Sequence, residues 1–313
     1  DSIELGFLSI FALMTFFIFL ITEKYSYKLS NGLLLDKDFN KPQAFHDRPI
    51  SRSGGFACLI SLLLFIYFYY IIYEKILYEY IYISSSLFFI GYIDDMKIKI
   101  SPNTRLILMI FFLIFFINFL SIQIYNLDLI FLKSWLENKI FLSLFILLCF
   151  LFIVNGANLI DGFNGLLALN LIIINSVLLF INLTNNHLEL SFFLTGQIII
   201  LISLLLFNFP QAKIFLGDSG SYLLGSTVAL NVIFTNNLNP QVSSFFFCIL
   251  LFYLFFEVFF SFMRKIYQRK SPVLPDNKHL HMLSFKKISE IFGHQKGNYI
   301  NSIFINLVFC ALI

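Results

Sequence analysis

Long apolar runs separated by short polar segments make up most of the chain. A transmembrane helix needs about 20 consecutive, mainly apolar residues, and runs of about that length recur along the whole sequence. They lie at 5–22, 54–73, 77–93, 104–124, 139–154, 165–183, 190–209, 222–235, 244–262 and from 299 to the last residue. This pattern predicts an all-α, polytopic membrane protein with about ten transmembrane helices.

The composition agrees with a membrane protein. Hydrophobic residues make up 59% of the chain and charged residues 12%, a balance that soluble domains do not have. No polar interval is long enough for a separate soluble domain, so residues 1–313 are predicted to form one domain. The 43 Phe residues are read as part of this hydrophobicity rather than as an aromatic site. The net charge of +3 is too small to indicate a nucleic-acid partner.

The two ends of the sequence and its cysteines lead to three further predictions. The first apolar run lacks a basic flank and a small-residue cleavage site, so no cleavable signal peptide is predicted. The sequence starts without Met and stops early in its last run, which suggests a chain truncated at one or both ends. The four cysteines, Cys58, Cys149, Cys248 and Cys310, lie in apolar runs and are expected to act as small hydrophobic residues.

The distribution of basic residues predicts the orientation in the membrane. Alternate connections (23–53, 94–103, 155–164, 210–221 and 263–298, with Arg105 at a helix mouth) carry all but three of the 21 Lys and Arg residues. The exceptions are Lys75, Lys133 and Lys139. Positive charge is enriched in cytoplasmic loops, so all five connections are predicted to face the cytoplasm.

Aspartates stand at the mouths of two predicted helices. Asp94 and Asp95 end the third apolar run, and two adjacent carboxylates repel each other unless a cation or a raised pKa relieves the repulsion. Asp218 lies in a glycine-containing turn, Gly217-Asp218-Ser219-Gly220, where the backbone can approach a ligand closely. Carboxylate oxygens suit a divalent metal; ordinary solvated charges and a plain turn are the alternatives.

Polar residues also recur every three positions after the fifth run, at Asn155, Asn158, Asp161 and Asn164. At helical spacing they would share one side. A polar seam between helices would explain the asparagines, but an ionisable residue beside glycines at a helix end favours a hydrated site.

Two further cytoplasmic loops contain basic and polar residues. His279 and His281 follow a basic cluster that starts at Arg264. Their i, i+2 spacing does not fit a helical zinc site, and hydrogen bonding to a polar substrate or a phosphate is the better functional reading. The loop at 39–55, which ends in Arg52-Ser53-Gly54-Gly55, contains prolines and glycines that exclude a regular helix. It could meet phosphates, although topology alone would explain its charge.

Together these segments resemble a known family, the polyprenyl-phosphate N-acetylhexosamine-1-phosphate transferases of the MraY/WecA type (glycosyltransferase 4). The resemblance covers nearly the whole chain and depends on five motifs in the family's order. They are Arg52-x-Gly54-Gly55, Asp94-Asp95 with Ser101-Pro102 and Arg105, the Asn155-to-Leu166 segment, Phe215-to-Ser221, and His279-Leu280-His281.

The resemblance implies a reaction and a set of roles. In this family a polyprenyl phosphate attacks the sugar-bearing phosphorus of a UDP-sugar, which gives a polyprenyl diphospho-sugar and UMP, with Mg²⁺, or Mn²⁺ in its place, offsetting the repulsion between anions. It implies Asp218 as the metal ligand and Asp94, Asp95 and Asp161 as catalytic carboxylates. A phosphate monoester is largely ionised at neutral pH, so strict base catalysis by an aspartate is not required. The substrate-binding residues implied or placed beside these motifs are Asn155, Asn158, Phe215, Lys97, His279, His281 and Arg52.

Departures from the family pattern indicate which branch of the family the chain resembles. Asn164 stands where the family commonly has a second Asp, and Ile98 stands where the muramyl-pentapeptide enzymes have Lys. Three consecutive His residues are also absent from the sequence. The chain is therefore expected to resemble the N-acetylhexosamine branch, which uses a UDP-N-acetylhexosamine, UDP-GlcNAc by default, and undecaprenyl phosphate. We expect a bacterial inner membrane location with the active site on the cytoplasmic face; a homodimer is compatible with the sequence.

Two other classes of membrane protein share some of these features. Intramembrane aspartyl proteases also set two Asp residues at helix ends and use a Gly-x-Gly-Asp motif, but position 215 is Phe, and the asparagine and histidine segments would go unexplained. A non-enzymatic transporter would place ionisable residues near mid-membrane, whereas these carboxylates gather at one face.

Overall fold

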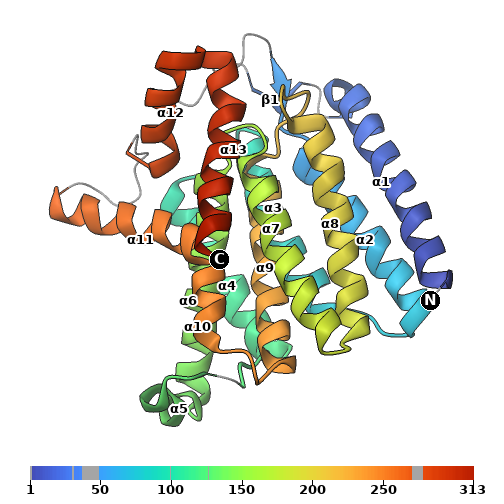
Figure 1. Ribbon diagram of the computed structural model, residues 1–313, viewed down its shortest axis with the longest axis vertical. Coiled ribbons are helices and arrows are strands. Elements are labelled where there is room, and N and C mark those ends of the chain that lie inside the picture. Colours follow the sequence, from blue (N-terminus) through green and yellow to red (C-terminus); the bar gives the residue numbers. More distant parts are fainter. Residues whose placement is uncertain (1, 30–31, 37–48, 99, 126, 270–277) are drawn as a thin grey trace.

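The computed structural model describes residues 2–29, 32–36, 49–98, 100–125, 127–269 and 278–313. Long helices lie side by side in these ranges and form most of the molecule (Figure 1). Much of the predicted loop 39–55 and the segment 270–277 of the histidine loop lie outside the described residues, as does Lys99. The predicted all-α architecture is confirmed for the described part of the chain.

The helices follow one another with short connections, and one pair of two-residue strands precedes α2. The elements are α1 (Ser2–Leu29), β1 (Leu35–Asp36), β2 (Ile50–Ser51), α2 (Gly54–Tyr73), the π-helical turn η1 (Tyr80–Ser84), α3 (Ser85–Asp95), α4 (Pro102–Phe119), α5 (Ile130–Leu136), α6 (Lys139–Ile160), α7 (Leu166–Thr184), α8 (Leu188–Asn208), α9 (Gly217–Leu238), α10 (Ser244–Leu250), α11 (Phe252–Tyr267), α12 (Leu280–Phe292) and α13 (His294–Leu312).

Among the described residues, six helices are long and apolar enough to cross a membrane: α1, α2, α4, α6, α7 and α8. A seventh span results if α10 and α11, which meet at a bend of 70°, form one broken segment. The remaining three predicted spans, 77–93, 222–235 and the run from 299, are helical but do not meet the same length and composition test. The structure thus indicates a multi-pass membrane protein, and the number ten stays a prediction.

Helix α9 occupies the centre of the bundle and packs against α2, α3, α6 and α7. Most of its side chains are buried, polar ones included. Asn231, for example, donates hydrogen bonds to Asn175 and Gln197 and accepts one from Tyr80. Such contacts hold helices together where water is excluded. The helix carries Asp218 in its first turn, so the most deeply packed element positions a predicted site residue.

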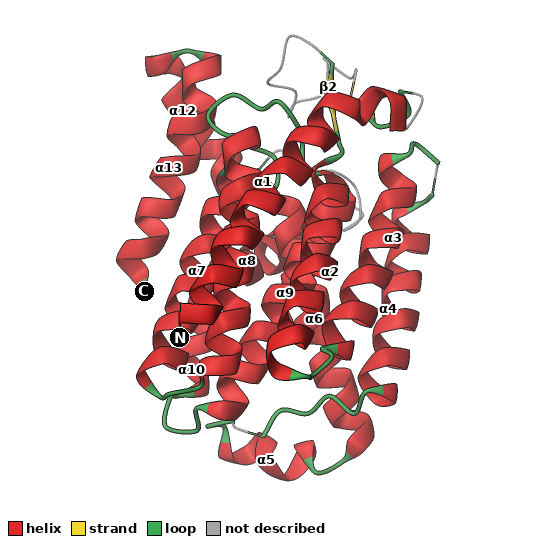
Figure 2. Ribbon diagram, turned by 90° about the vertical axis from the view of Figure 1, so that its right-hand side faces the viewer, coloured by secondary structure: helices red, strands yellow, loops and turns green. Residues whose placement is uncertain are grey.

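The polar loops converge at one end of the bundle. Figure 1 shows β1 and α12 at the top, Figure 2 shows β2 and α12 there, and α5 lies at the bottom in both views. Lys75 and Lys139, two of the three basic exceptions, flank helices at this lower end. The alternation of all five basic connections stays a prediction.

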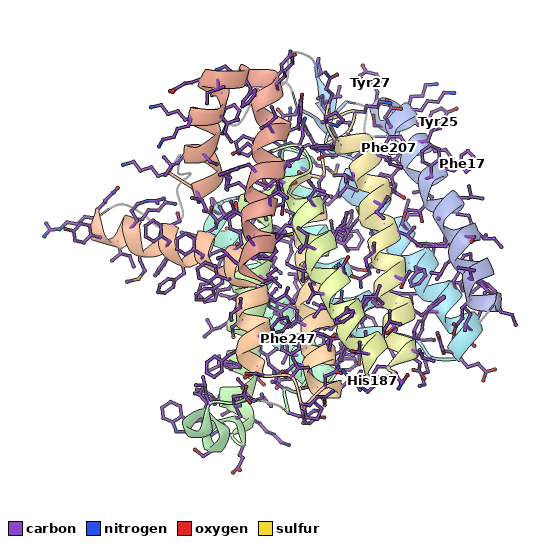
Figure 3. The ribbon with its side chains drawn as sticks, in the orientation of Figure 1. Phe17, Tyr25, Tyr27, His187, Phe207 and Phe247 are labelled. Atoms are coloured by element: carbon purple, nitrogen blue, oxygen red, sulfur yellow. The ribbon has the colours of Figure 1, made fainter. Side chains whose placement is uncertain are left out.

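Aromatic side chains fill and coat this bundle. Phe207 is buried between α8 and α1, where its ring stacks on Phe19 with centroids 6.0 Å apart. Phe17, on the outer face of α1, is 54% exposed and points away from the bundle (Figure 3). Exposed Phe of this kind is expected on a surface that faces lipid, which agrees with the reading of Phe as general hydrophobicity.

The predicted connection 263–298 differs from the structure in part. Helix α11 continues to Tyr267, α12 begins at Leu280, and α13 begins at His294, so much of this loop is helical. Helix α11 leaves the bundle sideways (Figure 1). Its buried stripe of Tyr253, Glu257 and Ser261 recurs every four residues. The sequence analysis predicted neither the bend between α10 and α11 nor helix α12. It located spans by the length of apolar runs, and an amphipathic helix does not form such a run.

Candidate functional site

Glycines bring the first loop into contact with the turn before α9. The backbone N–H of Gly54 donates to Phe215 O, and that of Gly55 donates to Leu216 O, each at 2.9 Å. A Cβ on Gly54 would lie 2.8 Å from Phe215 O, closer than real contacts allow. Phe215 N in turn donates to Ser51 O at 2.8 Å. The Arg-x-Gly-Gly motif therefore packs against the Phe215-to-Ser221 motif, which fixes the backbone of both.

Asp95 joins α3 to the start of α9. Its two carboxylate oxygens accept hydrogen bonds from the backbone N–H groups of Asp218, at 3.1 Å, and Ser219, at 2.9 Å. A carboxylate at a helix N-terminus satisfies free donors and is favoured by the helix dipole. The side chain is buried. Burial and the charge of Asp218 raise the pKa of Asp95 to about 7, and hydrogen bonds from Ser219 and the charge of Arg52 oppose the shift.

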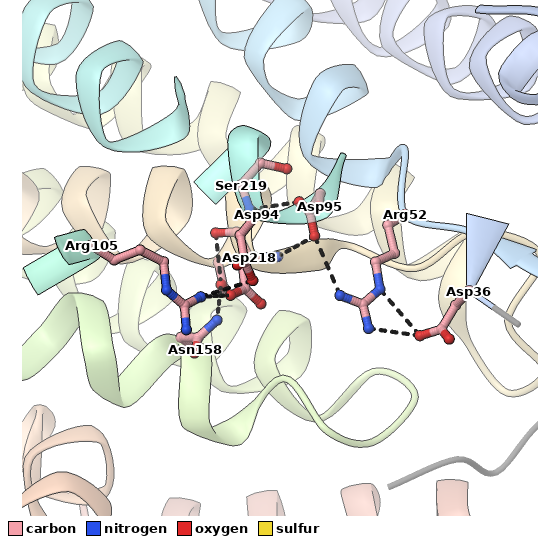
Figure 4. Close-up of polar contacts among 9 residues, drawn as sticks. Asp36, Arg52, Asp94, Asp95, Arg105, Asn158, Asp218 and Ser219 are labelled. Atoms are coloured by element: carbon pink, nitrogen blue, oxygen red, sulfur yellow. Dashed lines mark hydrogen bonds and ion pairs between the residues drawn. The ribbon is translucent and has the colours of Figure 1, made fainter. Parts of the chain in front are cut away.

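Arg105 bridges the other two aspartates of the cluster, as Figure 4 shows. Its Nη1 lies 2.9 Å from Asp94 Oδ2 and 2.6 Å from Asp218 Oδ2. All three side chains keep some exposure, 28% for Asp94, 19% for Arg105 and 22% for Asp218, so a polar ligand can reach them. Burial and then the charge of Asp218 raise the pKa of Asp94, while Arg105 lowers it.

Arg52 lies on the opposite side of Asp95. Its Nη2 and Nε donate to Asp36 Oδ2 at 2.7 and 3.2 Å, and its Nη1 lies 3.6 Å from Asp95 Oδ1 (Figure 4). Asp36 belongs to β1, which pairs with β2 beside Arg52. Sequence reasoning missed Asp36, because a lone Asp in a basic loop carries no distinguishing signal.

The asparagine segment divides at the end of α6. Asn155 Nδ2 donates to Leu151 O within the helix at 2.7 Å, and Asn158 Nδ2 donates to Ser221 Oγ at 3.0 Å. The helix ends at Ile160, so Asp161 and Asn164 lie in the turn beyond it. The expectation that all four polar residues share one helical side is therefore wrong for the last two.

Asp161 and Asn164 have different surroundings in that turn. Burial, followed by the charges of Asp218 and Asp95, raises the pKa of Asp161. Asn164 Nδ2 donates to Pro210 O at 2.9 Å, and its N–H donates to Asn298 Oδ1 at 2.9 Å. The residue that departs from the family pattern thus ties the turn to two neighbouring segments.

The predicted histidines lie on a buried carboxylate. His279 Nδ1 donates to Glu257 Oε2 at 2.8 Å, Leu280 N donates to Glu257 Oε1 at 3.0 Å, and His281 Nδ1 lies 3.4 Å from the same Oε1. The two imidazole rings stack in parallel with centroids 5.4 Å apart. Since a carboxylate can only accept, the contact fixes a proton on His279 Nδ1. Phe163, from the turn after α6, packs edge-on against the His281 ring at 5.6 Å.

Sequence reasoning also missed Glu257. A signal was available, because an ionisable residue within an apolar run, here 244–262, marks a functional site by default. The remaining predicted residues are peripheral in this arrangement. Lys97 is exposed in the turn after α3, and Phe215 is partly buried beside Ser51.

Two carboxylates of the site suit a divalent cation. Asp94 and Asp218 direct one oxygen each at a single cationic nitrogen, and carboxylate oxygens are the ligands that Mg²⁺ prefers, with water and substrate phosphates completing the shell. Within the described ranges, no group of three Asp, Glu, His or Cys side chains is arranged to hold a metal. Asp94 and Asp218 could supply part of the ligand shell of Mg²⁺, with water and substrate phosphates as the other ligands.

These observations define a helical multi-pass membrane protein with an acidic and basic cluster where several helices end. Its sequence places it in a family: residues 77–236 match the model of glycosyl transferase family 4, and the chain belongs to that family. The matched region contains Asp94, Asp95, Arg105, Asp161 and Asp218.

Three relatives show the range of similarity. An undecaprenyl-phosphate alpha-N-acetylglucosaminyl 1-phosphate transferase of Thermotoga maritima is 29% identical, over 80% of this chain and 77% of its own length. A phospho-N-acetylmuramoyl-pentapeptide-transferase of Dictyoglomus turgidum is 27% identical, over 70% of this chain and 71% of its own. A protein of the same name from Petrotoga mobilis is 30% identical, over 55% of this chain and 56% of its own.

Proposed function

We propose that this protein transfers an N-acetylhexosamine 1-phosphate group from a UDP-sugar to undecaprenyl phosphate and releases UMP. UDP-GlcNAc is the default donor, and the product would be the first lipid-linked intermediate of a cell-envelope polysaccharide. The observation that carries the proposal is the meeting of Asp94, Asp218 and Arg105 at one end of the bundle. Membership of glycosyl transferase family 4 and the names of the relatives support it.

The reaction needs an arrangement of charges more than it needs a base. A lipid phosphate oxygen attacks the phosphorus that bears the sugar, the bond from that phosphorus to the UMP oxygen breaks, and UMP leaves as an anion. No proton must be removed from a lipid phosphate that is already ionised, given its second pKa of about 6. Catalysis of phosphoryl transfer then depends on positioning and on offsetting negative charge.

The residues of the chain have separate tasks in this proposal. Asp218 and Asp94 would hold Mg²⁺, which when bound offsets the charge of the diphosphate and polarises it. Asp95 holds the first turn of α9, and through it Asp218, in place. Arg52 and Lys97 supply positive charge for phosphates. Asp161, in the turn after α6, would be the further carboxylate of the site.

The remaining predicted residues would bind the donor. Asn155 and Asn158 face it from the end of α6, and Phe215 offers a ring for uracil. His279 and His281 would read the sugar or its phosphate, and Glu257 keeps the His279 ring in one orientation by accepting from Nδ1. Phe163 packs against His281, so the histidine segment is in contact with the turn that carries Asp161.

The geometry does not favour the two alternative classes. An aspartyl protease needs two carboxylates that share a proton, but Arg105 lies between Asp94 and Asp218 and forms an ion pair with each. A transporter would hold its ionisable residues near mid-membrane, and these residues lie at helix ends.

The test is UMP release by the purified protein in nanodiscs with undecaprenyl phosphate and Mg²⁺. The donors are UDP-GlcNAc, UDP-GalNAc and UDP-N-acetylmuramoyl-pentapeptide, and we expect turnover with the first. Asp218→Asn should abolish release. Asp128→Asn is the matched control, because Asp128 caps α10 at the opposite end through Ser243 and Ser244. No UMP from any donor would exclude the proposed reaction.

The predicted location on the cytoplasmic face of the inner membrane has a separate test. Inverted membrane vesicles that contain the protein should release UMP from added UDP-GlcNAc, because the donor then meets the exposed site. Sealed right-side-out vesicles should not do so until a detergent opens them. Equal release from both kinds of sealed vesicle contradicts the proposed orientation.

A further inference from the structure

Arg105 and Asp94 both stand where a helix disfavours their charge. Arg105 lies in the first turn of α4, and Asp94 lies in the last turn of α3. Cations are unfavourable near helix N-termini, and anions near C-termini. Neither residue therefore stabilises its own helix through the dipole. What offsets each charge is the ion pair between them, together with Asp218.

A single nitrogen makes both ion pairs of Arg105. Nη1 lies 2.9 Å from Asp94 Oδ2 and 2.6 Å from Asp218 Oδ2. A cation ligated by the same two oxygens would take the position that this nitrogen fills. Space and charge repulsion prevent the guanidinium and a divalent cation from being there together.

The hydrogen bonds of the Arg105 side chain do not use all of its donors. Its Nε is buried and has no hydrogen-bond partner within the described part of the chain. Arg52 differs, because its Nε and Nη2 both donate to one carboxylate oxygen of Asp36. An unmet buried donor costs free energy, so Arg105 loses less than Arg52 would on leaving its position.

We propose that Arg105 is an exchangeable counter-ion. It neutralises Asp94 and Asp218 while no metal is bound, and it moves away when a divalent cation binds these two carboxylates. The two carboxylates and one guanidinium carry one net negative charge, which a divalent cation changes to one net positive charge. The freed guanidinium then faces an anionic phosphate of the substrate, so the cation binds before the donor.

The first test measures Mn²⁺ affinity by titration calorimetry, with no substrate present. Arg105→Gln removes the competitor and should bind Mn²⁺ about tenfold more tightly than wild type, a difference of about 1.4 kcal/mol. Lys97→Gln is the matched control, since it removes one positive charge from the exposed turn three residues beyond Asp94 and should change affinity much less. Equal or weaker binding by Arg105→Gln than by Lys97→Gln overturns the proposal.

The second test uses the wild-type protein, so it does not depend on how a variant folds. Phenylglyoxal modifies arginine side chains, and peptide mass spectrometry resolves the site. Mn²⁺ should speed modification of Arg105 and leave that of Arg52 unchanged. Protection of Arg105 by Mn²⁺ overturns the exchange. The inference rests on the proposed function only where it identifies the anion that the freed guanidinium faces as a substrate phosphate. Neither test contains a UDP-sugar. A protein that releases no UMP could therefore still show cation exchange, and the two results are independent.

Discussion

Replacing Gly91 by Ala tests whether the contact between α3 and α9 builds the site. Gly91 lies one turn before Asp95, and a Cβ there would lie 2.5 Å from the backbone C and O of Asp218 and from Ser219 N. Ordinary contact begins at 3.4 Å, so the helices would have to separate by about 0.9 Å. The hydrogen bonds from Asp218 N and Ser219 N to Asp95, now 3.1 and 2.9 Å, would then exceed normal length.

We expect two effects of this separation. Overpacking costs about 1–3 kcal/mol of the free energy of unfolding, and a displacement near 1 Å at a reacting centre costs about 100-fold in rate. UMP release measures the rate. Differential scanning calorimetry measures thermal unfolding.

The matched control is Gly6→Ala in α1, where an added Cβ meets nothing within 4 Å. It should leave the rate unchanged and the unfolding temperature equal or slightly higher, since Ala favours a helix over Gly. A Gly91→Ala protein with the unfolding temperature and kcat/KM of Gly6→Ala would refute the view that this close approach positions the aspartates.

Three other expectations concern the buried carboxylate, the departure from the family pattern and pH. Glu257→Gln keeps an acceptor for Leu280 N but loses the charge that His279 contacts, so thermal unfolding should report a loss of about 1–3 kcal/mol; wild-type stability and rate would contradict this. Asn164→Asp loses the donor to Pro210 O and should cost about 0.5–1.5 kcal/mol; tighter Mn²⁺ binding by calorimetry would show that the family's carboxylate role had been restored instead. A carboxylate must lose its proton to bind a cation. The pKa of Asp94, a proposed ligand, is raised by burial and by the charge of Asp218, and the pKa of Asp95, which holds the turn that presents Asp218, is raised to about 7. The rise in unfolding temperature on adding Mg²⁺ should therefore be larger at pH 8 than at pH 6, and the reverse trend would contradict these protonation states.

The course of the chain through the bundle could be predicted because lipid demands long apolar helices. The second predicted span, 54–73, coincides with α2 (Gly54–Tyr73). The bend between α10 and α11 could not be predicted, since Leu250 to Phe252 contains neither Pro nor Gly. Helix α12 carries Lys286, Lys287 and Glu290, and its polar composition hides it from a search for apolar runs.

The residues of the site could be predicted more fully than their contacts. Asp94, Asp95 and Asp218 were found from motifs, and the structure brings them together. Arg105 is predicted at a helix mouth and belongs to the motif of Asp94 and Asp95. Its bridging position depends on the angle between α3 and α4, which no local pattern contains. Glu257 is distant in sequence from His279, and only the fold of α11 against the histidine segment brings them within 2.8 Å.

The adjacent residues Asp94 and Asp95 belong to one motif but make different contacts, which the motif alone does not reveal. Successive side chains on a helix point about 100° apart, so Asp94 and Asp95 cannot face the same partner from the end of α3. Asp95 faces the backbone of α9 and accepts from two N–H groups. Asp94 faces Arg105, in the partly exposed space shared with Asp218. The second carboxylate therefore holds in place the helix turn that presents Asp218, and the first is left accessible for a cation.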